Sequence, residues 1–371
     1  MTPRRITPRR RKILIFTTTF LIGLVLVYGG SVVSRSHDLY GSVKSSRRGW
    51  SGRILRSDPV LGIANTPGAI GAETYPIGPD VPSRIDRDGL RVPVDSADPP
   101  VRSGPLVLAL GCSFTYGSSV LAEETFSHIF ARAIGGSEMN AGICGGGAAQ
   151  MLVRARELIQ SHRPAFVLAQ FSPWLAERSR ADHAPTYEGL VPTPRFIRGA
   201  SGMELRPPGF GGIAFDVPVS EYRSTEKSTA EFMSFLGRVG VPLLVHDDFA
   251  RVVLSARRIG SGDEPTLAEI EAHVYLEIAH LCRESGSQLV LVWLEGRPPG
   301  DPWAVPSLAA ELGVPIAAGT KRMVDELETK TREVFVATYT LMRGDPPRCV
   351  DAHPNARAHA LIADEISRAI R

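Results

Sequence analysis

The sequence predicts a three-layer α/β/α protein with a mainly parallel sheet, preceded by one N-terminal transmembrane helix. Short apolar runs of strand length, at 106–110, 165–171 and 288–294, alternate with segments of helical spacing. Such alternation is typical of parallel sheets covered by helices on both faces. A 21-residue stretch, 13–33, holds no charged residue and is long enough to cross a hydrocarbon core of roughly 30 Å.

The N-terminal charge predicts the orientation of this helix. Residues 1–12 contain six bases and no acid, so we expect them to form a cytoplasmic basic tail, with residues 34–371 outside a cell (inner) membrane. A cleaved signal peptide and a buried core helix are the alternatives. An uncleaved single-pass anchor is favoured because the apolar run exceeds the usual 7–15 residues of a signal peptide. The formal net charge of +3 leaves −3 beyond residue 12, so no nucleic-acid surface is expected.

Composition divides the remaining chain. Residues 34–104 are rich in Pro, Gly, Ser and Arg, which predicts a tether and irregular turns with one hairpin at most. Residues 105–371 form the predicted main domain, with an insertion at about 180–263 over the carboxyl ends of the strands. The insertion contains His246-Asp247-Asp248, but no second ligand cluster has suitable spacing, so neither a metal nor a cofactor is expected.

A serine follows the first buried strand. The segment 106–117 reads LVLALGCSFTYG, which predicts a strand, a tight turn at Gly111, and Ser113 beyond the strand's carboxyl end, where α/β sheets place ligands. The Gly-x-Ser-x-Gly turn of α/β-hydrolases is excluded, because it would need glycine where Thr115 stands. An ordinary Ser/Gly turn remains the alternative.

An acid and a histidine lie near the C-terminus, in the segment CVDAHPN at 349–355. In extended backbone Asp351 and His353 point the same way, so the carboxylate can bind the histidine Nδ1–H and fix its tautomer. We expect both in a loop before the last helix, with Pro354 in that helix's first turn. A helix entry with an aspartate cap is the alternative.

Three blocks in order, GCSFTYG, MNAGI with CGGG, and DAHPN, resemble those of the SGNH (GDSL-type) hydrolase family. The resemblance implies a flavodoxin-like sheet, Ser113 as nucleophile, His353 as base and Asp351 as its orienting acid. It also implies an oxyanion hole from the backbone N–H groups of Ser113 and Gly142.

Three departures from the family pattern are present. Cys112 replaces the usual aspartate, and the Asp-to-His spacing is one residue shorter than usual. The asparagine expected after strand 165–171 is absent, since the sequence there reads QFSPW. Ser172 and Gln170 are the candidates to replace this side-chain donor.

The resemblance and the anchor together imply a membrane-anchored extracytoplasmic serine esterase. Its expected substrates are acyl esters, with O-acetyl groups of envelope or exported polysaccharide favoured, and its other contact is the lipid bilayer through 13–33. An O-acyltransferase, and a catalytically silent relative that binds glycan or an envelope partner, are the alternatives.

Four cysteines are present, and three of them, Cys112, Cys144 and Cys349, fall in or beside the site blocks. Outside the cytoplasm a Cys112–Cys144 or Cys144–Cys349 disulfide is permitted. Free buried thiols are the default expectation for these and for Cys282.

Overall fold

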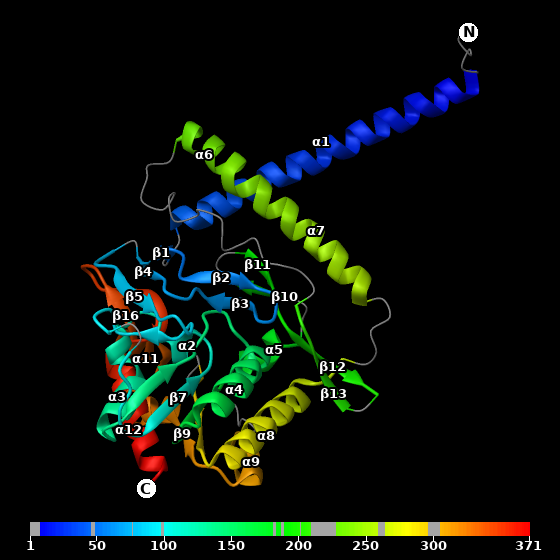
Figure 1. The fold of residues 1–371 in the computed structure, drawn as a ribbon. Helices are drawn as coiled ribbons and strands as arrows, with labels where there is room; N and C mark the ends of the chain where they lie inside the picture. The colour runs from blue at the N-terminus through cyan, green and yellow to red at the C-terminus, as the bar shows by residue number, and fades with distance from the viewer. Residues whose placement is uncertain are drawn as a thin grey trace. The chain divides into compact units, whose positions relative to one another are not determined.

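The structure is a computed structural model that describes residues 8–45, 49–75, 77–97, 100–180, 183–186, 189–200, 202–208, 228–258, 264–295 and 305–371 (Figure 1). The chain divides into two compact units. Unit 1 comprises Met1–Ser45 and Val217–Phe249, and unit 2 comprises Ser46–Asp216 and Ala250–Arg371.

Unit 1 contains the predicted N-terminal helix. Helix α1, Pro8–Ser45, has 38 residues and is therefore about 57 Å long, extending twelve residues beyond the anchor predicted at 13–33. Within it, Ile15–Gly41 is long and apolar enough to cross a membrane.

The C-terminal part of α1 packs against helices from the middle of the chain. These are α6 (Thr229–Phe235), a π-helical turn (Leu236–Gly240) and the start of α7 (Val241–Arg258). Tyr40 lies against the ring of Phe235, and Arg35 forms an ion pair with Asp248 at 2.7 Å. Asp248 therefore pairs with a cation of α1. Among the described residues, no group of three or more His, Cys, Asp or Glu side chains is placed to hold a metal ion.

A nine-stranded sheet forms the centre of unit 2. Its parallel part has the spatial order β8 (Ser137–Asn140), β7 (Leu106–Leu110), β9 (Phe166–Phe171), β14 (Gln288–Trp293) and β15 (Ile316–Ala317). Counted along the chain this order is 2-1-3-4-5, the doubly wound arrangement whose switch point lies at the first strand. The predicted α/β class with parallel central strands is confirmed.

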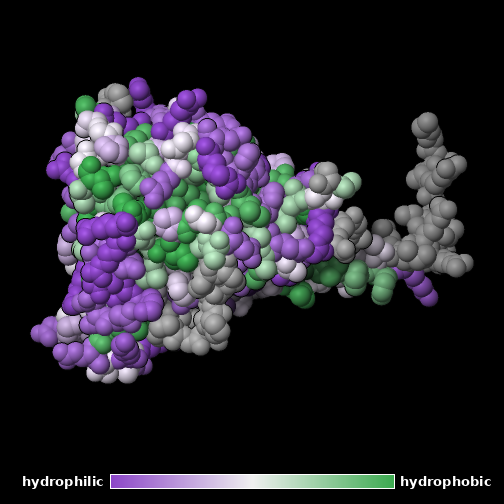
Figure 2. All heavy atoms as spheres, turned by 90° about the horizontal axis from the view of Figure 1, so that it is seen from below, coloured by the Kyte–Doolittle hydropathy of each residue, from purple (hydrophilic) through white to green (hydrophobic). Residues whose placement is uncertain are grey.

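Helices cover both faces of this sheet, and β7 shows how the layers form. Its alternate side chains face opposite cores: Leu108 and Leu110 belong to one hydrophobic cluster, and Val107 and Ala109 to the other. The first cluster includes residues of α4 (Ala148–His162), α5 (Pro173–Arg178), α8 (Leu267–Ser285) and α9 (Val305–Leu312). The second includes residues of α3 (Phe126–Ala133), α10 (Gly319–Asp325), α11 (Arg332–Tyr339) and α12 (Ala356–Ala369). Figure 2 views the molecule from below, and on this face hydrophobic residues gather between hydrophilic ones.

The tether predicted within 34–104 is contradicted at residues 34–45 and 49–92. Residues 34–45 belong to α1, and the strands β1 (Gly49–Ser51), β4 (Ile70–Thr74), β5 (Val81–Ile85) and β6 (Arg91–Val92) extend the main sheet in antiparallel fashion. A separate hairpin is formed by β2 (Leu55–Asp58) and β3 (Gly62–Asn65). These strands have two to five residues each, which is too short for a clear period-two pattern in the sequence. Strand β6 joins the sheet by pairing Arg91 with Asn140 of β8, which is distant in the sequence.

The residues of the predicted insertion at 180–263 do not form one compact unit. Two hairpins, β10 (His183–Thr186) with β11 (Gly189–Pro192) and β12 (Arg195–Gly199) with β13 (Gly202–Arg206), belong to unit 2. The helical residues 228–249 belong to unit 1. Residues 209–227 of the predicted insertion lie outside the described residues.

The segment carrying Asp351 and His353 is a strand, and the predicted loop is corrected accordingly. Strand β17 (Arg348–Pro354) pairs antiparallel with β16 (Thr340–Arg343). Pro354 ends this strand, and Asn355 caps α12 by accepting the N–H of Ala358 at 3.1 Å. The extended backbone predicted for the Asp-x-His pair is present because β16 supplies its hydrogen-bond partner.

Candidate active site

The tight turn after β7 places Ser113 at the carboxyl end of the parallel strands. Gly111 leaves the strand, and Ser113 is the first residue of the short helix α2 (Ser113–Tyr116). A Cβ at Gly111 would lie 2.1 Å from Thr115 Oγ1 and 2.4 Å from Gln170 Oε1. Glycine is therefore required at this position by close packing.

Ser113, His353 and Asp351 lie in one hydrogen-bonded row. Ser113 Oγ is 2.8 Å from His353 Nε2, and His353 Nδ1 is 2.5 Å from Asp351 Oδ1. The backbone N–H of His353 also donates to Asp351 Oδ1, at 3.0 Å. Each of the three residues is 7% exposed. A carboxylate at Nδ1 selects the tautomer whose Nε2 can accept the serine proton.

Aromatic rings hold the imidazole in place. The ring of Phe114 meets His353 edge-on with centroids 5.3 Å apart, and Trp174 meets Phe114 edge-on at 5.2 Å. Since Phe114 directly follows the serine, this stack ties the histidine to the turn that carries Ser113.

Gln170 and Ser172, the sequence candidates for the missing side-chain donor, form a buried network beneath this turn. Gln170 Oε1 accepts from Cys112 N at 3.1 Å and from Thr115 Oγ1 at 2.8 Å. Its Nε2 donates to Ser172 Oγ at 2.8 Å and contacts Cys112 Sγ at 3.2 Å. The Ser172 hydroxyl donates to the carbonyl of Leu294. The donors of both residues are thus already used, and the network stabilises the turn.

The backbone N–H of Gly142 is also already hydrogen-bonded. Its N–H donates to Asn140 Oδ1 at 3.0 Å, and a Cβ there would lie 2.3 Å from Tyr116 N. The structure therefore gives Gly142 a packing role in place of the oxyanion donor that the sequence suggested.

The turn after Gly142 lies beside the nucleophile. Ile143 N donates to Gly111 O at 3.1 Å, Gly146 N closes the turn onto Ile143 O at 2.9 Å, and Gly145 has φ +78°. This left-handed position, which the Gly145-Gly146-Gly147 run signals in the sequence, turns the backbone toward α4. Gly145 was not among the residues singled out from the sequence.

Trp174 is a second residue that the sequence analysis missed. It lies in the first turn of α5, directly after β9, and its Nε1–H donates to Cys112 Sγ at 3.3 Å. Ser113 Oγ is 3.9 Å from the same sulfur. The indole N–H therefore reaches the neighbourhood of the serine from the segment where the family pattern places asparagine.

The strands before residue 105 support the loop that follows Ser113. Buried Arg91 donates to the carbonyls of Tyr116 at 2.6 Å and Val120 at 2.5 Å. Buried Glu73 accepts from the N–H of Ser119 at 2.9 Å. The segment expected to be a tether thus helps to shape the site.

The four cysteines form no disulfide in the structure, and Cys112, Cys144 and Cys282 are buried. Cys112 serves as the acceptor described above, and Cys144 Sγ lies 3.5 Å from Ser118 Oγ. Burial raises the pKa of the Cys282 thiol to about 12, so this cysteine is not a nucleophile at neutral pH.

No protein-family model and no curated protein matches the sequence. Among solved structures, the chain is similar to TesA, with 10% identity and a TM-score of 0.37 over 72% of this chain and 98% of that one. A member of the lipolytic protein G-D-S-L family from Veillonella parvula DSM 2008 has 10% identity and a TM-score of 0.36 over 71% and 97%. The psychrotrophic esterase EstA from Pseudoalteromonas sp. has 12% identity and a TM-score of 0.34 over 72% and 97%.

The family to which the three sequence blocks pointed is thus represented among these structures.

Proposed function

We propose that unit 2 is a serine esterase of the SGNH type. The observation that carries this proposal is the buried row from Ser113 Oγ through His353 to Asp351, with separations of 2.8 and 2.5 Å. A serine hydroxyl is a weak nucleophile until an adjacent base accepts its proton. Here that base is already within hydrogen-bond reach, and its other nitrogen faces a carboxylate.

In the proposed reaction, Ser113 Oγ attacks the ester carbonyl carbon while His353 Nε2 takes the hydroxyl proton. Asp351 stabilises the imidazolium that forms. The tetrahedral intermediate then collapses, the C–O bond to the leaving alcohol breaks, and His353 protonates the departing oxygen. Water, deprotonated by the same imidazole, cleaves the acyl-serine ester and releases the acid.

The oxyanion of the intermediate needs donors near Ser113. We assign the backbone N–H of Ser113, at the start of α2, and that of Gly145, in the turn whose first residue hydrogen-bonds Gly111. The indole N–H of Trp174 is the side-chain donor, moving from Cys112 Sγ to the oxyanion. This assignment is supported by the acceptors involved: the indole N–H donates to sulfur, a weak acceptor, whereas the donors of Gln170, Ser172 and Gly142 bind oxygen atoms.

Hydrolysis of p-nitrophenyl acetate by the full chain tests the activity, and Ser113→Ala should abolish it. The matched control is Ser118→Ala, because Ser118 is a buried serine of the same loop whose hydroxyl contacts a cysteine. Equal activity of wild type and Ser113→Ala would overturn the proposal. A fluorophosphonate probe should label Ser113, and repeated failure to label the folded chain would favour a catalytically silent relative that binds glycan.

For the natural substrate we propose O-acetyl esters of envelope or exported polysaccharide, reached from the membrane by an enzyme anchored through α1. Support comes from the apolar span Ile15–Gly41 and the six bases before residue 13. The reach of a long tether no longer supports this proposal, because β1, β4, β5 and β6 belong to the main sheet and β2 and β3 form a hairpin.

Reporters fused after Arg371 test the location. We expect alkaline phosphatase to be active and green fluorescent protein to be dark. The reverse pattern would place Ser113 in the cytoplasm and remove the polysaccharide argument, while leaving the esterase proposal intact.

A further inference from the structure

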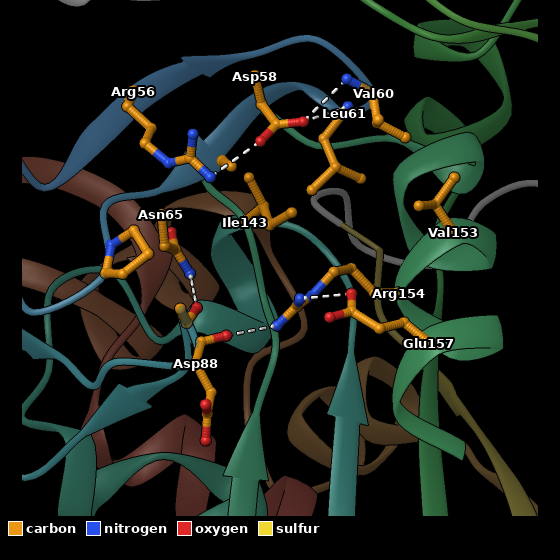
Figure 3. Close-up of a pocket in the computed structure, with 13 residues that line it drawn as sticks. Arg56, Asp58, Val60, Leu61, Asn65, Asp88, Ile143, Val153, Arg154 and Glu157 are labelled. Carbon is orange, nitrogen blue, oxygen red and sulfur yellow. Dashed lines mark hydrogen bonds and ion pairs between the residues drawn. The ribbon is translucent and has the colours of Figure 1, made fainter. Parts of the chain in front are cut away.

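A cavity of about 270 Å³ lies in unit 2, and Ser113 is not among the residues that line it (Figure 3). Its walls come from the β2–β3 hairpin, the turn at Asp88 and Gly89, the side chain of Ile143, and α4. This volume is just below the roughly 300–1,000 Å³ of pockets for drug-sized ligands. The cavity therefore suits a ligand about the size of one sugar ring.

A buried amide at this cavity has an unused acceptor. Asn65 is 4% exposed, and its Nδ2 donates to the carbonyls of Gly89 at 3.1 Å and Gly142 at 3.0 Å. Its Oδ1 is buried and has no hydrogen-bond partner among the described residues. A buried acceptor left unpaired is energetically unfavourable, so the site favours a ligand that brings a donor.

Arg154 supplies donors on the same wall. It is 9% exposed, and it uses Nη1 for Glu157 Oε2 at 2.8 Å and Nη2 for the carbonyl of Asp88 at 3.1 Å. A guanidinium has five N–H groups, so these two bonds leave donors for a ligand. Figure 3 shows Arg154 extended across the cavity toward Asp88.

Two arginines and three acids line the cavity, and most of its other lining residues are aliphatic. Arg56 pairs with Asp58 at 2.9 Å, and Arg154 with Glu157, so no surplus of positive charge favours an anion. Apolar contacts are supplied by Val60, Leu61, Pro67, Ile143 and Val153. A buried acceptor, arginine donors and aliphatic walls together match a neutral sugar ring, whose hydroxyls both donate and accept and whose C–H groups are apolar.

The cavity shares a wall with the proposed active site. Gly142 O accepts from Asn65, whereas the next residue, Ile143, donates its N–H to Gly111 O beside the nucleophile turn. Arg154 lies seven residues along α4 from Gly147, the helix N-cap, or about 10 Å. The cavity is thus a neighbour of the catalytic turn but does not contain the ester.

We infer that the Asn65–Arg154 cavity is a subsite for a neutral sugar ring of the acylated glycan, away from the ester that Ser113 attacks. The inference rests on the proposed function for its substrate. Binding of a sugar ring in this cavity would explain how an enzyme that reacts with a small acyl group selects a polymer.

Binding by the full chain carrying Ser113→Ala, in nanodiscs without glycoside detergent, tests the subsite directly. The probes are cellohexaose, xylohexaose and chitohexaose, measured by saturation-transfer difference NMR. Val153→Phe fills the cavity and Arg154→Met removes its donors, so each should weaken binding of the preferred hexasaccharide at least tenfold. Arg156→Met is the matched control, because Arg156 is on the same helix but pairs with Glu277. Its affinity should stay within twofold.

Kinetics provide a second readout. In the Ser113-containing chain, Val153→Phe and Arg154→Met should raise KM for the O-acetylated hexasaccharide at least tenfold and leave kcat/KM for p-nitrophenyl acetate within twofold. Absence of binding for all three probes, unchanged affinity in both variants, or equal loss on both substrates would overturn the subsite. Cavity-dependent binding by a chain without esterase activity would support the subsite and refute the proposed function.

Discussion

His353 and His359 are six residues apart and both buried, yet their surroundings differ completely. His353 lies between two side chains, with Asp351 hydrogen-bonded at its Nδ1 and Ser113 at its Nε2. His359, in α12, stacks on Phe126 with ring centroids 5.7 Å apart, and its Nδ1 accepts the N–H of Phe126 at 3.1 Å. Burial, with smaller effects of Arg91 and His353, lowers the pKa of His359 to about 3.

This difference separates His353, which we propose as the base, from His359, and burial is common to both. His353 has an anion to stabilise its charged form and a hydroxyl to deprotonate. His359 has an aromatic ring and a backbone donor, so it stays neutral and acts as a packing residue.

The largest expected effect is that of His353→Ala. Without the base, kcat for p-nitrophenyl acetate should fall by about 10⁶-fold, as for the loss of a catalytic histidine in other serine hydrolases. His359→Asn is the control and should retain at least a third of the activity at pH 7. If His353→Ala keeps more than one hundredth of the wild-type rate while folded by circular dichroism, the assigned base is wrong.

Asp351→Asn tests the carboxylate. The amide can hold the imidazole in the wrong tautomer and cannot stabilise its charged form, so kcat should fall by about 10⁴-fold. A merely structural role predicts a lower melting temperature with near-normal kcat per folded molecule. Thermal melts and single-turnover rates measured on the same sample distinguish these results.

Trp174→Phe separates hydrogen bonding at the site from ring packing around His353. Phenylalanine retains an aromatic ring against Phe114 but removes the indole N–H, so we expect kcat to fall by about 10²-fold with little change in KM. Trp293→Phe, on β14, is the matched indole control. An unchanged kcat in Trp174→Phe would remove this residue from the oxyanion hole.

The smallest effect on activity, and the clearest on stability, is expected at His359. Because its folded pKa of about 3 lies below the unfolded value of 6.5, the unfolded chain binds a proton first as pH falls. Stability from this group is full above pH 6.5 and decreases by about 1.4 kcal/mol per pH unit as pH falls from 6.5 toward 3.

His359→Asn retains a side-chain acceptor for Phe126 but does not titrate. In urea melts of the full chain, the unfolding free energy of wild type minus that of this variant should therefore decrease as pH falls from 6.5 to 3. A difference that stays constant across this range would mean that His359 does not titrate as described. Kinetics at pH 7 serve as the activity control.

The predictable parts of the fold were those encoded in local sequence patterns. The apolar run ending at Gly111 placed Ser113 after a strand, and the charge-free run at 13–33 lies within helix α1. The two-residue spacing of Asp351 and His353 indicated that both face one side, which holds in β17. Each of these patterns lies within a few residues, where side-chain periodicity and glycine determine the backbone.

The errors have a common physical cause. The strands at 49–92 carry too few residues for a pattern, and their edges are completed by partners elsewhere in the chain, as in the pairing of Arg91 with Asn140. Likewise, β17 was expected to be a loop because its partner β16 could not be recognised beforehand. Strand pairing is a property of two segments, and one segment's composition does not reveal it.

The sequence by itself determined the layered α/β architecture, a long apolar N-terminal helix and the residue types at the proposed site. Only the tertiary structure decided which groups meet. It brought Ser113 to His353 across 240 residues, used the donors of Gln170, Ser172 and Gly142 within the fold, and left Asn65 Oδ1 without a partner at a cavity. The reason is that a side chain's hydrogen-bonding capacity is fixed by its chemistry, whereas its use depends on neighbours that folding brings from distant parts of the chain.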